Sequence, residues 1–178
     1  MPPFRLKRFP VLAAICIIGV RGALVNWGFI THASTVLQVY GFAASGPMVW
    51  PPVVFFSLFG AVIAIVKDVP DVKGDAMFGI RSFSVRFSPV TVLNNATILI
   101  CGGFCAAAGA LGLGAAGAAT GMDSVRRGAL AVLALLTARV IWRRKALVDA
   151  DDRVAVYSFY MWLWRCFYGA YVALPFAR

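Results

Sequence analysis

Three aspartates stand close together in a short charged segment of an otherwise apolar chain. Asp68, Asp71 and Asp75 fall within eight residues, although the sequence holds only seven Asp and Glu residues in all. Their spacing would place the three carboxylates on one face of a helix, with Asp68 as its N-cap. Like charges on one face repel one another unless a cation neutralises them, and carboxylate oxygens suit Mg²⁺. The segment is therefore predicted to bind a divalent metal.

Basic residues surround these carboxylates, namely Lys67, Lys73, Arg81 and Arg86. A site for a metal alone gains nothing from nearby cations, whereas a metal-bound diphosphate uses them for the oxygens that the metal leaves free. Lys67, Lys73 and Arg81 are accordingly the predicted diphosphate ligands. The alternative is a solvated loop in which Asp and Lys simply pair, an arrangement that contributes little to stability.

The composition of the chain indicates which kind of elements position this segment, because it is strongly apolar. Of the 178 residues, 61% are hydrophobic and 13% are charged, and the formal net charge is +10. Soluble domains are nearer to about half apolar and about a quarter charged. The basic residues sit mainly between apolar runs, as they do in membrane loops, so no nucleic-acid partner is expected.

Five apolar runs are long enough, or nearly so, to cross a bilayer core that takes roughly 20 residues of helix. The predicted fold class is therefore all-α, a polytopic membrane helix bundle with residues 1–178 as a single transmembrane domain. The predicted spans lie at about 10–30, 48–66, 90–119, 128–142 and 154–177, with the Asp-rich loop at 67–88.

The distribution of Lys and Arg orients these spans. Most of these residues fall in the N-terminal segment, the loop 67–88 and the loop 143–153, which lie on one side if five spans alternate. Positive charge collects on the cytosolic or stromal side of membranes, so the Asp-rich loop is predicted there.

Two arginines fall near the middle of predicted spans, Arg21 in the first and Arg165 in the fifth. An arginine at that depth usually faces a cavity or a partner. We expect one of the two side chains to meet an anionic substrate head group. The alternative is that they cap helix carbonyls or lie in a water pocket.

Four stretches of the sequence resemble the UbiA-type intramembrane prenyltransferases, and within that family the homogentisate prenyltransferase branch. They are residues 2–10 (PPFRLKRFP), 20–26 (VRGALVN), the loop 67–75 with its continuation 78–85 (FGIRSFSV), and 164–176 (WRCFYGAYVALPF). The resemblance implies a nine-helix fold in which the five runs correspond to the last five helices and residues 67–75 to the second of two Asp-rich motifs. The first motif, N-x-x-x-D-x-x-x-D, is absent, so we expect the C-terminal portion of a longer enzyme. Lys73 stands where relatives usually carry Glu, and Arg165 where they tend to carry Lys or Asn.

The implied activity is Mg²⁺-dependent transfer of a prenyl group from a prenyl diphosphate to homogentisate, with loss of its carboxylate, in tocopherol or plastoquinone biosynthesis. Phytyl is favoured as the donor by residues 78–84, and solanesyl is the alternative. The implied place is a chloroplast membrane or a cyanobacterial-type one. Residues expected to line the substrate cavity, some of them as aromatic faces for an allylic carbocation, are Arg21, Asn26, Trp27, Tyr160, Trp164, Arg165 and Tyr168.

Two other classes of function stay open at this point. The three aspartates could form the ion or solute site of a transporter, although such sites usually lie at the membrane midplane rather than at a helix end. The chain could also be a catalytically inactive fragment with an assembly role. The sequence leaves the oligomeric state open.

Overall fold

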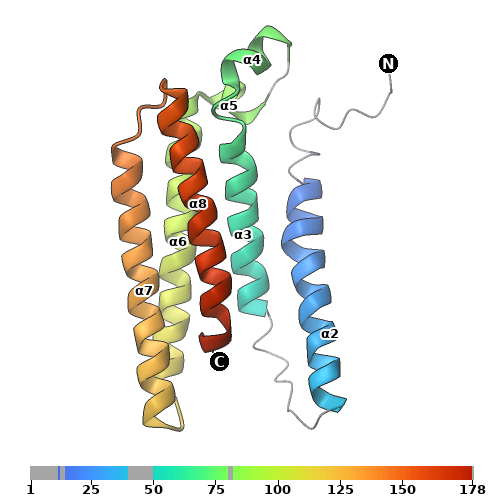
Figure 1. Ribbon diagram of the computed structural model, residues 1–178, viewed down its shortest axis with the longest axis vertical. Coiled ribbons are helices and arrows are strands. Elements are labelled where there is room, and N and C mark those ends of the chain that lie inside the picture. Colours follow the sequence, from blue (N-terminus) through green and yellow to red (C-terminus); the bar gives the residue numbers. More distant parts are fainter. Residues whose placement is uncertain (1–11, 13–14, 40–49, 80–81, 178) are drawn as a thin grey trace.

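A computed structural model describes residues 12, 15–39, 50–79 and 82–177 of the chain. Within that part every regular element is a helix, which confirms the all-α prediction. The long helices, which run side by side in Figure 1, are η2 (Ile17–Leu24, a π-helix) continuing into α2 (Val25–Val39), α3 (Trp50–Lys67), α6 (Pro89–Ala116), α7 (Gly121–Ala146) and α8 (Arg153–Ala173). The short helices are α4 (Val72–Met77), α5 (Phe83–Phe87) and the 3₁₀ turn η4 (Leu174–Ala177).

Polar side chains start three of the long helices. The Ser88 hydroxyl accepts a bond from the Thr91 backbone N–H at the start of α6, where Pro89 follows as the first helical residue. The Thr120 hydroxyl accepts from Asp123 N at 3.1 Å before α7, and the Asp152 carboxylate accepts from Val154 N at 2.8 Å before α8. Each cap satisfies a backbone donor that the first helical turn leaves without a partner, and so fixes where the helix begins.

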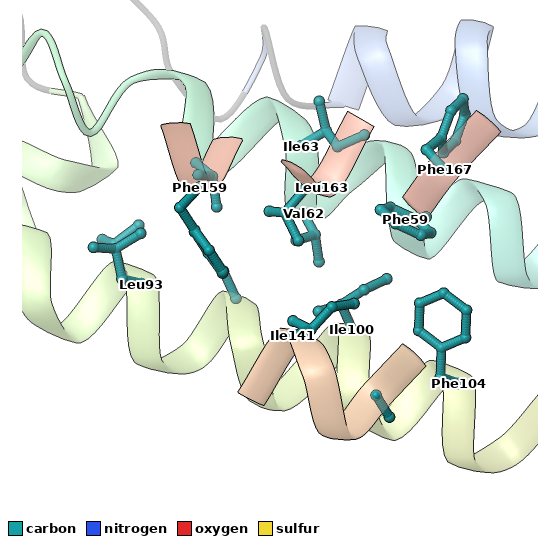
Figure 2. Close-up of a cluster of buried hydrophobic side chains, with 14 of the residues drawn as sticks. Phe59, Val62, Ile63, Leu93, Ile100, Phe104, Ile141, Phe159, Leu163 and Phe167 are labelled. Atoms are coloured by element: carbon teal, nitrogen blue, oxygen red, sulfur yellow. The ribbon is translucent and has the colours of Figure 1, made fainter. Parts of the chain in front are cut away.

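The core lies between α3, α6, α7 and α8. Figure 2 shows residues of all four helices meeting there, and Phe59, Val62, Ile100 and Ile141 have no exposed surface. Phe59 lies edge-on to Phe104 of α6 and to Phe167 of α8, with ring centroids 5.7 and 5.3 Å apart. Edge-to-face contacts of this kind add to the burial of the rings, so the three helices are joined by a shared aromatic cluster.

The N-terminal helix packs on α3 through a glycine. A Cβ at Gly22 of η2 would lie 2.8 Å from the Cα of Ser57. A side chain at position 22 would therefore meet the α3 backbone, so this close approach requires glycine.

The five apolar runs overlap the five long helices, with different ends. The first helix ends at Val39 rather than at residue 30, and α7 begins at Gly121 rather than at residue 128. Both extensions carry polar residues that are compatible with helix but not with an apolar run; in α7 an ion pair between Arg126 and Asp123 (2.8 Å) supports the first turn.

One helix of the described residues, Pro89–Ala116, has both the length and the hydropathy needed to cross a membrane. Pro51–Lys67 is apolar but shorter. The short helices α4 and α5 lie at the same end of the bundle as the connection from α7 to α8, whereas the turn between α6 and α7 lies at the other end (Figure 1).

Candidate active site

The Asp-bearing segment is a turn followed by a short helix rather than one continuous helix. α3 ends at Lys67, and a bond of 3.1 Å from Val69 N to Val66 O continues its last turn. The Val69 side chain is only 4% exposed, so it packs in the core between the end of α3 and the start of α4. The N-cap predicted at Asp68 is therefore wrong, since Asp71 holds that position in front of α4.

The three carboxylates differ in their surroundings, because Asp71 is exposed whereas Asp68 and Asp75 are half-buried. The break between α3 and α4 removes the single helical face on which the three were expected. Among the described residues, no three His, Cys, Asp or Glu side chains lie close enough to hold a metal ion. Mg²⁺ usually takes one or two carboxylates and completes its shell with water and substrate phosphates. Metal binding by Asp68, Asp71 and Asp75 therefore stays a prediction, and it would need water and phosphate oxygens to complete the shell.

An ion pair joins this segment to α8. Nη2 of Arg153, the first residue of α8, lies 3.0 Å from Oδ1 of Asp71. The two side chains are 75% and 59% exposed, so water and salt screen the pair and it adds little to stability. The pair matters for position, because it holds the guanidinium of Arg153 beside Asp71 at the start of α4.

The predicted diphosphate ligands lie on the surface near this pair. Lys67 ends α3 and Lys73 lies in α4, and both are exposed. Arg81 lies outside the described residues. Together with Arg153, the two lysines provide several cations at one end of the bundle, where a doubly charged anion would find hydrogen-bond donors.

Both polar atoms of the Asn26 side-chain amide make hydrogen bonds within the protein. Its Nδ2 donates to Gly22 O at 2.6 Å, and its Oδ1 accepts from the Tyr171 hydroxyl at 2.6 Å. Tyr171 stacks on Phe56 of α3, with ring centroids 3.8 Å apart. Asn26 therefore ties the N-terminal helix to α8, and its contact with a substrate stays a prediction.

The aromatic residues predicted to line a cavity form a row along α8. The rings of Tyr160 and Trp164 lie edge to face at 6.4 Å, and Trp164 stacks on Tyr168 at 5.5 Å. Tyr160 and Trp164 pack against the edge of the core, whereas Tyr168 is 58% exposed. The row thus leads from the core to the surface of the described bundle. Trp27 of α2 lies apart from it and is exposed.

The contact of Arg165 with a substrate stays a prediction, and its side chain is exposed on the surface of the described part. The reason is helical phase. Leu163 and Phe167 face the core, and a residue two positions from each is turned by about 200° around a helix axis. The side chain of Arg21 lies outside what the structure describes, although its backbone belongs to η2.

Comparison with known proteins identifies the family of this helical bundle. The sequence profile described as the UbiA prenyltransferase family matches residues 2–166. The chain belongs to the UbiA prenyltransferase family. The resemblance seen in the sequence is thereby confirmed.

Relatives of this UbiA-family chain are named as homogentisate prenyltransferases. A probable homogentisate phytyltransferase 1 of rice is 33% identical over 100% of the chain, and a homogentisate geranylgeranyltransferase of wheat is 34% identical over 99%. A homogentisate solanesyltransferase of Arabidopsis thaliana is 32% identical over 99%. The chain spans 42%, 41% and 44% of these relatives, which is about two fifths of their length. No solved structure matches the chain.

Two residues of this UbiA-family site were not singled out from the sequence. In the sequence, Arg153 is one of the basic residues of the loop 143–153, which the distribution of Lys and Arg places on the same side as the Asp-bearing segment. Tyr171 lies in a matched stretch, but no local pattern indicates that its hydroxyl reaches Asn26, because the two residues are far apart in the sequence.

Proposed function

We propose that the protein takes part in prenyl transfer from a prenyl diphosphate to homogentisate, with loss of the acceptor's carboxylate, in tocopherol or plastoquinone biosynthesis. The observation that carries the proposal is that the family profile and the homogentisate prenyltransferases both match nearly the whole chain. The arrangement of charges around Asp71 supports it, because carboxylates and cations meet at one end of an apolar bundle.

The diphosphate binds at the Asp-bearing segment in this proposal. Asp68, Asp71 and Asp75 are the residues from which the carboxylate ligands of a shared Mg²⁺ would come, with water and diphosphate oxygens completing its shell. The bound metal would supply charge neutralisation for the departing group. Lys67, Lys73 and Arg81 take the remaining oxygens. Arg153 joins them, since its guanidinium already lies 3.0 Å from Asp71 and needs only to be shared between the two anions.

Prenyl transfer then needs a dry space for a short-lived cation. The bond between the allylic carbon and the diphosphate oxygen breaks, and its electron pair leaves with the diphosphate. A ring carbon of the acceptor forms the new carbon–carbon bond and then loses its proton. The carboxylate leaves as carbon dioxide, and the carbon that carried it takes up a proton. The row Tyr160, Trp164 and Tyr168 offers aromatic faces to the cation, and the apolar bundle keeps water away.

The acceptor's anionic group is assigned to Arg21 or Arg165, with Asn26 near the same cavity. Arg165 is exposed on α8. An exposed arginine in the middle of an apolar helix is costly in lipid, so this face meets a polar ligand or further polypeptide in the working enzyme.

The membrane placement follows from the same features. The protein is an integral, multi-pass protein whose five long helices correspond to the last five of a nine-helix bundle. Residues 1–178 form one transmembrane domain, with the Asp-bearing segment on the stromal or cytosolic side. α6 supports this placement by its length and hydropathy, and the chloroplastic relatives support a chloroplast membrane.

An enzyme assay with defined donors tests the proposal. Membranes containing the full-length protein are incubated with homogentisate, Mg²⁺ and phytyl, geranylgeranyl or solanesyl diphosphate, and products are separated by mass spectrometry. We expect a prenylated, decarboxylated product, with phytyl the preferred donor. Asp71→Ala should abolish it, whereas the matched variant Asp151→Ala, an exposed aspartate outside the segment, should not.

Two results would contradict the proposal. A fully active Asp71→Ala variant would remove the metal and diphosphate assignment. Absence of product with every donor, under conditions in which a homogentisate prenyltransferase is active, would favour an inactive protein with an assembly role.

A further inference from the structure

A cavity opens between α6 and α7, away from the Asp-bearing segment on α3, α4 and α8. Its volume is about 350 Å³, which is the size of a small ligand pocket. Its lining residues come from the early part of α6 and the last turns of α7: Asn94, Thr97, Ile98, Trp142, Lys145 and Ala146. The cavity therefore lies at the end of the bundle where the short helices α4 and α5 also lie (Figure 1).

The charge in this cavity is a single cation. Lys145 donates from Nζ to Oδ1 of Asn94, and the Thr97 hydroxyl donates to Leu93 O at 2.7 Å. Among the described residues the ion pairs are Arg126–Asp123 and Arg153–Asp71, neither of which involves the lining. A neutral amide does not balance an ammonium, so a negative ligand group would lower the cost of holding Lys145 in an apolar wall.

The rest of the lining is apolar and open to the outside. Ile98 and Trp142 are each 55% exposed, and Ala146 continues the same wall. A tryptophan at a membrane–water boundary places its ring among the first methylenes of the lipid and its N–H toward the head groups. The wall thus suits a hydrocarbon chain that starts beside the ammonium.

Neighbouring cations add to this preference without competing for the same place. Arg144 lies 3.9 Å above the ring of Trp162 and is directed to α8, while Arg143 is exposed and outside the lining. Three consecutive basic residues at the end of a membrane helix attract anionic lipids, and only Lys145 of the three reaches into the cavity.

We propose that this cavity binds an anionic membrane phospholipid, with its phosphate against Lys145 and one acyl chain along Ile98 and Trp142. The proposal rests on the membrane placement proposed above. It is independent of the prenyl-transfer chemistry, because none of the lining residues belongs to the Asp-bearing segment.

Native mass spectrometry of the purified protein in detergent tests the proposal. The protein is titrated with phosphatidylglycerol and, separately, with phosphatidylcholine of the same acyl chains. We expect phosphatidylglycerol to remain bound at the lower concentration, and Lys145→Gln to weaken its apparent affinity about fivefold, the effect of one cation near a lipid surface. Arg143→Gln removes the same charge two residues away, outside the lining, and should have a smaller effect.

A second variant leaves the charge intact. Ile98→Trp fills the apolar part of the cavity and should displace the lipid while Lys145 remains. The proposal is overturned if both lipids bind equally, if Lys145→Gln and Arg143→Gln weaken binding equally, or if phytyl diphosphate displaces the phospholipid from this site. Carbonate extraction tests the membrane placement separately from lipid binding. A protein released from the membranes by carbonate would refute the membrane placement itself.

Discussion

The hydroxyl of Tyr171 on α8 donates a hydrogen bond of 2.6 Å to the side-chain oxygen of Asn26 on α2. Asn26 in turn donates to Gly22 O at 2.6 Å, so one buried amide connects the first described helix to the last long one. The same tyrosine stacks on Phe56 of α3. Three helices therefore meet at a polar contact within an apolar bundle.

Tyr171→Phe should lower the thermal stability of the protein. The substitution keeps the ring stacked on Phe56 and removes only the donor to a buried oxygen, which costs about 1 kcal/mol. Thermal unfolding in detergent, followed by circular dichroism, measures the change. Tyr157→Phe is the control, because Tyr157 is 54% exposed and its loss of a hydroxyl should leave the melting temperature unchanged. Equal effects of the two variants would contradict the assigned role of the contact.

Gly22→Ala should separate η2 from α3. The new methyl group would lie 2.8 Å from Ser57 Cα, which is backbone and cannot move aside, and overpacking of this kind costs about 1–3 kcal/mol. Gly28→Ala is the matched control. Its new methyl group would meet nothing within 4 Å, and a gain in helix propensity should make it neutral or slightly stabilising. Limited proteolysis and thermal unfolding should rank the variants in that order, and the reverse order would refute the close approach.

Arg153→Gln should affect substrate binding more than stability. The ion pair with Asp71 is exposed, so its loss should change the unfolding free energy by less than about 1 kcal/mol. If the guanidinium is shared with the diphosphate, KM for the prenyl diphosphate should rise about fivefold while the melting temperature stays constant. Arg143→Gln serves as the charge-matched control. An unchanged KM in Arg153→Gln would leave the pair with a structural role only.

Removal of divalent metal should stop prenyl transfer. Treatment with EDTA should abolish product formation, and added Mg²⁺ should restore it, because a metal shared with the diphosphate neutralises the charge of the departing group. Asp75→Asn should raise the Mg²⁺ concentration for a half-maximal rate about tenfold, the order seen when a metal loses one supporting contact. Full activity in EDTA would count against metal dependence, whereas a normal Mg²⁺ response of Asp75→Asn would remove only that residue from the site.

The helices could be predicted from the sequence because their cores are apolar runs, and α3 and α6 illustrate this. Their ends could not be predicted from hydropathy, since the polar first turn of α7 is held by Thr120 and by the pair Arg126–Asp123, which make helix without adding to an apolar run. Family membership could also be predicted, because the charged loop and the closing stretch 164–176 resemble the motifs of the family.

The site could be predicted only in part. The sequence places Asp68, Asp71 and Asp75 in one segment, but it does not show that the Val69 side chain lies in the core within the break between α3 and α4. The exposure of Arg165 depends on helical phase rather than on depth along the span, and the inward positions of Leu163 and Phe167 determine it. Arg153 required the fold, since its partner Asp71 is distant in the chain.

The buried side chain of Val69 connects the Asp-bearing segment directly to the packing of the core. Val69 belongs to the same buried cluster as Val66 and Phe159, so a change of volume deep inside can shift the carboxylates without altering any charge. Among randomly generated variants, those that lose activity while keeping every Asp, Lys and Arg should therefore concentrate at these inner positions. A second substitution that restores the lost side-chain volume at a neighbouring core position should recover the activity of these variants.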